Sequence, residues 1–166
     1  LLRFLLPPLL VLTTAVAIVC MGPQGGMVRW WEGWFSYLLA VGFLVMAGFW
    51  LVKLALAAGR SLRQVRSYPE QNLLGRSGRL LPLAVPFVAQ IGFWQPELVV
   101  SQGVLDSFDA DHLEAVLTHE QAHRHYRDTF WFFWLGWLRH LTFWLPQTER
   151  LWQELLLLRE QRADAW

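Results

Sequence analysis

The chain has 166 residues, of which 55% are hydrophobic and only 16% are charged. Soluble domains carry about 25% charged residues, so this composition is typical of a membrane protein. The net charge of +1 gives no reason to expect a nucleic-acid partner, and the single cysteine, Cys20, excludes an intrachain disulfide and a cysteine-based zinc site.

Two apolar runs near the N-terminus predict two transmembrane helices, over residues 4–21 and 33–58. The first is near the lower limit of the ~20 residues that a helix needs to cross a bilayer, and the second exceeds it. A signal peptide is the alternative for the first run, but residues 22–24 form a poor cleavage site and a second apolar run follows at once. We therefore expect residues 1–58 to contact the lipid bilayer.

Arginines dominate the segment that follows, residues 59–82, where Glu70 is the single acid. Cytoplasmic loops beside transmembrane helices are enriched in Lys and Arg, so this segment is predicted to be a basic cytoplasmic linker. A nucleic-acid patch is the alternative, but juxtamembrane arginines more commonly contact anionic lipid. This orientation predicts a multi-pass protein of an inner or plasma membrane, with everything after residue 58 facing the cytoplasm.

Two short apolar runs bounded by Pro and Gly, residues 83–89 and 97–101, predict two strands that form a β-hairpin. Pro86 favours an edge position for the first strand. An exposed edge strand can pair with the backbone of an extended peptide, although this hairpin could equally serve only to cover the neighbouring helix. The residues expected to contact a substrate are Val85, Pro86, Phe87 and Val88.

The sequence H-E-x-x-H at residues 119–123 lies in a predicted amphipathic helix that Asp109 caps and that no Pro or Gly interrupts before Asp128. Residues four apart share a helix face, so His119 and His123 can bind one metal ion. Glu120 lies within reach of a water on that metal and can act as a general base. Zinc is the expected cofactor, one ion per chain. The alternative is a pair of solvated histidines, because the motif fixes only three of five positions.

The apolar residues 130–145 are interrupted by Arg139 and His140. This run is short for a span, so we expect a helix that lies in the membrane interface or is partly embedded. Pro146 then predicts the start of a last helix, which extends to about residue 165.

Glu160 and Asp164 share one face of that last helix. Glu160 could complete a His-His-Glu zinc site, and Asp164 could accept the free ring N–H of a ligand imidazole. Spacing alone leaves competing ligands open. These are Glu149, Glu154, His112, His125 and His140.

With these residues the chain resembles the membrane-bound gluzincin metallopeptidases, in particular the BlaR/MecR type, and then the HtpX and CAAX prenyl protease types. The resemblance covers about residues 84–166. The matching features are Pro86, Gly-Phe-Trp-Gln-Pro at 92–96, the helix from 112 to 123, Arg127-Asp128 and E-x-x-A-D at 160–164.

The resemblance implies a zincin-like helical core in which His119, His123 and Glu160 bind zinc and Glu120 is the catalytic base. It also implies that Asp164 orients a ligand histidine, most plausibly His119, and that Asp128 is structural at the helix end. The chain departs from the family at Ser101, where a Pro is common, and at the more polar Gln121. It ends before any downstream His or Tyr for the oxyanion, and it contains no penicillin-binding sensor region.

The expected fold is therefore a mostly α membrane protein with three parts: two transmembrane helices (1–58), a linker (59–82) and a metallopeptidase core (83–166). The lack of an initiator Met and the abrupt end at Trp166 predict a core truncated at its C-terminus. The expected function is zinc-dependent hydrolysis of peptide bonds in protein substrates at the cytoplasmic side, in signalling, antirepressor cleavage or membrane-protein quality control. The alternatives are a non-catalytic membrane sensor or scaffold and a membrane di-iron oxidase. No feature indicates an oligomeric state.

Overall fold

A computed structural model describes residues 1–24 and 29–166 of the chain. The chain divides into two compact units. The first contains residues 1–54 and 135–155, and the second contains residues 55–134 and 156–166.

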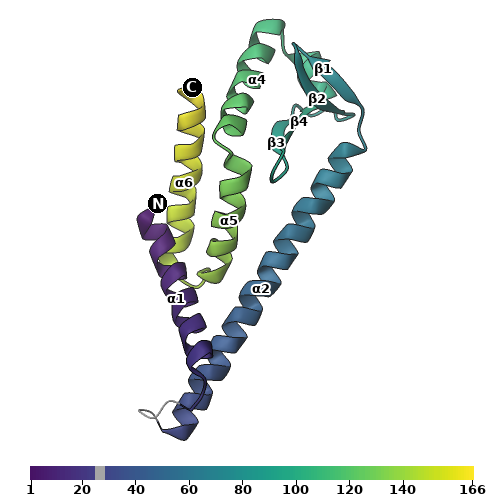
Figure 1. Ribbon diagram of the computed structural model, residues 1–166. Coiled ribbons are helices and arrows are strands. Elements are labelled where there is room, and N and C mark those ends of the chain that lie inside the picture. The colour runs from purple at the N-terminus through teal and green to yellow at the C-terminus, as the bar shows by residue number, and fades with distance from the viewer. Residues whose placement is uncertain (25–28) are drawn as a thin grey trace. The chain divides into compact units, whose positions relative to one another are not determined.

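Two long apolar helices form much of the first unit: α1 (Leu2–Met21) and α2 (Trp30–Arg66), which continues into the second unit (Figure 1). Both are long and apolar enough to cross a membrane. This agrees with the two helices expected from the sequence. However, α2 extends beyond residue 58, so the first part of the predicted linker is helical.

Two shorter helices complete the first unit: the second half of α5 (Asp128–Leu141) and the first part of α6 (Pro146–Asp164). The core consists of Phe4, Ala47, Leu135, Leu138 and Leu141. In addition, the indole Nε1 of Trp137 donates a hydrogen bond to the Ala47 carbonyl, at 2.9 Å. With 14 residues, α5 is about 21 Å long, which is shorter than the ~30 Å hydrocarbon core of a bilayer.

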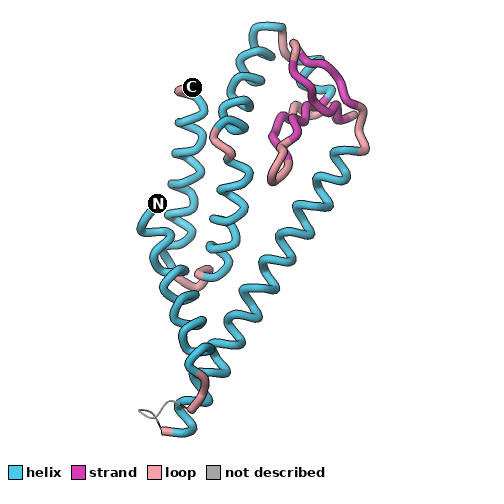
Figure 2. Tube along the Cα trace, viewed as in Figure 1, coloured by secondary structure: helices cyan, strands magenta, loops and turns pink. Residues whose placement is uncertain are grey.

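The strands, magenta in Figure 2, lie in the second unit. They form a four-stranded sheet in the order β1-β2-β4-β3. Its strands are β1 (Glu70–Leu73), β2 (Arg76–Leu81), β3 (Val88–Ile91) and β4 (Glu97–Ser101). The predicted hairpin is present, because β3 and β4 pair antiparallel. The predicted linker, however, contains a second hairpin, β1–β2, whose β2 strand pairs parallel with β4.

The first strand of the predicted hairpin begins later than expected, at Val88 and not at residue 83. The reason is Ser101. Its hydroxyl accepts a hydrogen bond from the Phe87 N–H and donates one to the Val85 carbonyl, both at 2.9 Å. These groups are therefore held by a side chain, and residues 85–87 lie outside β3. Of the four residues expected to contact a substrate, only Val88 lies on the edge strand.

Helices α3 (Gln102–Ser107) and α4 (Ala110–His125) follow the sheet. Leu117 of α4 packs against buried leucine and valine side chains of the sheet and α3. As predicted, Asp109 caps α4, because its carboxylate accepts a hydrogen bond from the His112 N–H at 2.9 Å. The helix ends earlier than expected because Arg127 adopts a left-handed conformation with φ of 55°, and α5 then begins at Asp128.

Candidate metal centre

Three side chains from two helices converge in the second unit. His119 and His123 project from one face of α4, and Glu160 comes from α6. This is the one group of three or more potential metal ligands found within residues 1–24 and 29–166. The helical spacing places both histidines on one face of α4, and the tertiary fold brings Glu160, 37 positions after His123, to that face.

The donor atoms have the spacing of a tetrahedral metal site. His119 Nε2 lies 3.1 Å from His123 Nε2 and 3.3 Å from Glu160 Oε2. His123 Nε2 lies 3.5 Å from the same carboxylate oxygen. Ligands placed 2.0–2.1 Å from a tetrahedral zinc ion are about 3.3–3.4 Å apart. The three atoms thus form one face of such a tetrahedron, without rearrangement of the helices.

Each imidazole is held by a carboxylate on its other ring nitrogen. His119 Nδ1 lies 2.9 Å from Asp164, and His123 Nδ1 lies 2.7 Å from Asp128. Asp128 accepts a hydrogen bond from Nδ1 of His123, which leaves Nε2 of that ring unprotonated in its neutral form. The nearby carboxylate of Asp164 favours the same tautomer of His119. In these tautomers both Nε2 atoms present a lone pair toward the shared position.

Two arginines of α6 hold the carboxylates in place. Arg159 donates to Glu160 Oε1, at 2.8 Å from its Nε, which leaves Oε2 to face the histidines. Arg162 donates to Oδ1 of Asp128, whose other oxygen faces His123. Sequence reasoning missed both arginines, because an arginine beside a glutamate on a helix usually lies in solvent. Their positions one before and two after Glu160 were the available signal.

The ionisation of the cluster follows from these contacts. Burial opposes ionisation of Glu160, but the hydrogen bonds and charge of Arg159, together with His123 and His119, hold its pKa below the usual value. The hydrogen bond to Asp128 raises the pKa of His123, although burial opposes this. Glu160 is therefore a carboxylate at neutral pH, as a metal ligand must be.

Glu120 differs from the other carboxylates of the site. Burial raises its pKa above the usual value, although the charges of His123 and His119 lower it. Within the described part of the chain, no side-chain hydrogen bond or ion pair engages it. A carboxyl group with a raised pKa and no fixed side-chain partner is suited to accept and release a proton.

The competing ligands considered from sequence lie elsewhere. His112 is exposed and pairs with Asp109, and His125 stacks on Trp166. Glu149 and Glu154 pair with the arginines at positions 139 and 150.

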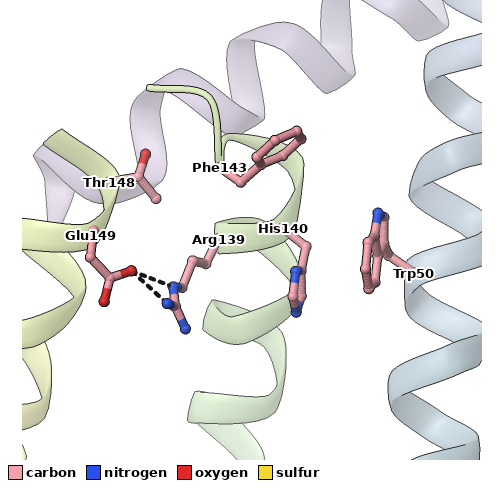
Figure 3. Close-up of a pocket in the computed structure, with 6 residues that line it drawn as sticks. All are labelled: Trp50, Arg139, His140, Phe143, Thr148 and Glu149. Atoms are coloured by element: carbon pink, nitrogen blue, oxygen red, sulfur yellow. Dashed lines mark hydrogen bonds and ion pairs between the residues drawn. The ribbon is translucent and has the colours of Figure 1, made fainter. Parts of the chain in front are cut away.

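His140, the remaining candidate ligand, lines a pocket of about 360 Å³ in the first unit (Figure 3). Its ring stacks on Trp50 with centroids 4.4 Å apart. The other charged groups of that pocket, Arg139 and Glu149, are bound to each other at 3.0 Å. This pocket therefore presents no group of metal ligands.

The comparisons with known proteins identify no relative: no family model, no curated protein and no solved structure matches this chain.

Proposed function

We propose that this chain is a membrane-bound zinc metalloendopeptidase that hydrolyses peptide bonds of protein substrates. The observation that carries the proposal is the convergence of His119 Nε2, His123 Nε2 and Glu160 Oε2 at distances suited to one tetrahedral ion. Three protein ligands leave a fourth position for water or substrate, which is the arrangement of catalytic zinc sites.

The residues of the site fit zinc better than other common metals. Two imidazoles and one carboxylate are a donor set that zinc accepts, whereas magnesium and calcium prefer oxygen ligands alone. A di-iron oxidase would need additional histidine or carboxylate ligands, and the described residues hold one three-ligand group. The ligand set therefore favours a single zinc ion.

Glu120 is the proposed general base. When bound, zinc supplies Lewis acidity that polarises a carbonyl and lowers the pKa of water toward ~7. The Glu120 carboxylate takes the proton from the attacking water and delivers it to the nitrogen of the departing amine. Asp164 and Asp128 keep the imidazoles in the tautomer that binds the metal.

The edge strand β3 is the proposed binding place for an extended substrate. It is the outermost strand beyond β4 and lies beside α4, the helix of both histidines (Figure 1). A peptide paired with its free edge would pass near the metal ligands. Because residues 85–87 are engaged by Ser101, the peptide would pair from Val88 onward.

Membrane attachment is the second part of the proposal. It is supported by α1 and α2, which have the length and composition of spanning helices. The arginines at the end of α2, Arg60, Arg63 and Arg66, favour a cytoplasmic position for the second unit. The substrate classes that fit a cytoplasmic site are signalling proteins, repressors and damaged membrane proteins.

Glu120→Gln tests the function. The variant should bind zinc as the wild type does and lose nearly all cleavage of an unfolded protein such as casein. The matched control is Glu114→Gln, which alters an exposed carboxylate on the same helix and should retain activity. Full proteolysis by Glu120→Gln would remove the proposal. Stoichiometric zinc without cleavage in the wild type would favour a non-catalytic scaffold.

A further inference from the structure

A polar pocket of about 540 Å³ lies in the second unit, and its lining includes none of the three metal ligands. The walls come from β1, β2, the turn between β3 and β4, the start of β4, and the end of α4. The charged and aromatic side chains of its lining are Glu70, Arg79, Trp94, Glu97, Arg124 and Arg127.

The two acidic side chains of the pocket are already neutralised. Glu97 accepts hydrogen bonds from Arg66 at 2.6 Å and from Arg79 at 2.9 Å. Glu70 accepts a hydrogen bond from the Ser77 hydroxyl and lies 3.6 Å from the guanidinium of Arg79. These carboxylates therefore have their counterions within the fold.

Arg124 and Arg127 differ from these two carboxylates in their charge balance. Both are exposed, and across residues 1–24 and 29–166 neither makes an ion pair. They follow the second histidine of α4 and contribute two uncompensated positive charges to the pocket. A pocket with this excess charge attracts an anion, and guanidinium groups match the geometry of phosphate oxygens.

The backbone at Arg127 places its side chain at the pocket. Its φ of 55° lies in the left-handed region, where glycine is the usual residue after a helix. This conformation turns the chain from α4 into α5, and it leaves the Arg127 side chain exposed in the lining of the pocket.

An exposed aromatic surface adjoins the pocket. Trp94 lines the pocket and is 76% exposed. Phe93 and Trp94 pack on Phe130 of α5, with ring centroids 4.9 and 5.4 Å apart, and the next residue, Trp131, is 57% exposed. Tryptophan beside arginine is typical of the membrane–water interface, where indoles lie at headgroup level and arginines contact phosphate.

We propose that this pocket binds the headgroup phosphate of an anionic phospholipid through Arg124 and Arg127, with Trp94 in the lipid interface. The indole and the aromatic cluster favour lipid over an acidic peptide, because a peptide carboxylate needs no exposed tryptophans. The presence of two helices suited to a bilayer places lipid within reach of the protein. The assignment does not depend on the proposed peptidase activity.

Lipid titration of the purified full chain in detergent tests the assignment, with bound lipid counted by native mass spectrometry. Wild type should bind phosphatidylglycerol more tightly than phosphatidylcholine. Arg124→Gln and Arg127→Gly should each weaken phosphatidylglycerol binding by about fivefold. Arg127→Gly removes the charge and relaxes the backbone, so the fold should survive. The control is Arg150→Gln, which alters an 83% exposed arginine outside the pocket and should bind as wild type does.

Three outcomes would overturn the assignment. The first is equal binding of both lipids by wild type, and the second is unchanged phosphatidylglycerol binding in both pocket variants. The third is tighter binding of inorganic phosphate or of a glutamate-rich peptide, lost in the same variants and not displaced by phosphatidylglycerol. That last result would assign the pocket to a soluble anion or a peptide.

Discussion

At the scale of single residues, the site depends on what holds each ligand. Three atoms face the metal position, and each belongs to a side chain whose other polar atom is already bonded. Asp128 is hydrogen-bonded to Nδ1 of His123, Asp164 lies 2.9 Å from Nδ1 of His119, and Arg159 donates to the second oxygen of Glu160. A site built this way loses little side-chain freedom when the metal binds.

Arg159→Gln should weaken zinc binding, because Glu160 Oε1 loses its charged partner and the carboxylate can rotate away from the histidines. Changes to groups that orient metal ligands typically cost about 10–100-fold in affinity. Competition against a chromogenic chelator measures the effect. Helix content by circular dichroism should stay unchanged, and wild-type zinc affinity in the variant would refute the role of Arg159.

The two aspartates should differ in their effect on zinc affinity. The side chain of Asp128 is 3% exposed, whereas that of Asp164 is 70% exposed. Loss of the buried partner leaves His123 without an acceptor, but water can replace the exposed partner of His119. Asp128→Ala should therefore weaken zinc binding more than Asp164→Ala in the same chelator competition. The reverse order would contradict this account of the Nδ1 contacts.

At the scale of elements, a close backbone contact fastens α3 to the segment before β3. The N–H of Gly103 donates to the Leu83 carbonyl at 2.9 Å, and a Cβ at this position would overlap the Ala84 carbonyl oxygen. Gly103→Ala should therefore lower the stability of the protein by about 1–3 kcal/mol, as overpacking does. Thermal unfolding in detergent measures this.

Gly59→Ala is the matched control for that substitution. A Cβ at Gly59 of α2 meets no atom within 4 Å, and alanine favours a helix. The control should be as stable as wild type or more stable. Equal stability of Gly103→Ala and wild type would show that residues 83–85 are not packed on α3.

Glu97 joins three elements and should make the second unit sensitive to acid. Burial opposes its ionisation, but Arg66 of α2 and Arg79 of β2 lower its pKa below 4.5. As the pH falls, the Glu97 carboxylate is therefore protonated in the unfolded chain before it is protonated in the folded protein. The stabilisation is present above pH ~4.5 and is lost as the pH falls through the folded pKa. Thermal unfolding from pH 7 to 3 should show a smaller acid-induced loss in Glu97→Gln than in wild type. Equal losses would refute the linkage.

Elements with a strong sequence signal were predicted well. The apolar runs predicted α1 and α2, Asp109 predicted the start of α4, and Pro146 predicted the start of α6. Each signal is local: hydrophobicity over 20 residues, a capping carboxylate, or a ring that fits the first helical turn.

Most of the misses arise from contact between residues distant in sequence. The β1–β2 hairpin was missed because its strands are polar and one is stabilised by parallel pairing with β4. The late start of β3 depends on the Ser101 hydroxyl, and the end of α4 depends on an arginine in a conformation that usually takes glycine. The hydrogen bond from Arg162 to Asp128 likewise requires the fold to bring α6 beside the start of α5.

At the scale of the whole molecule, the chain has two units that use the same helices for different purposes. In the first, α5 packs with the apolar helices through Leu135, Leu138 and Leu141, and Leu151 and Leu155 of α6 pack against the same core. In the second, the beginning of α5 and the end of α6 carry Asp128 and Glu160 to the metal ligands of α4. The proposed peptidase therefore has its third ligand on a helix that also packs in the first unit.

The zinc content of the purified full chain, measured together with X-ray absorption at the zinc edge, tests the central claim most directly. We expect one zinc ion per chain, with nitrogen and oxygen ligands at about 2.0–2.1 Å. Replacement of His119, His123 and Glu160 by alanine should abolish the signal. A wild-type chain without zinc after reconstitution, or a triple variant that retains it, would contradict the account.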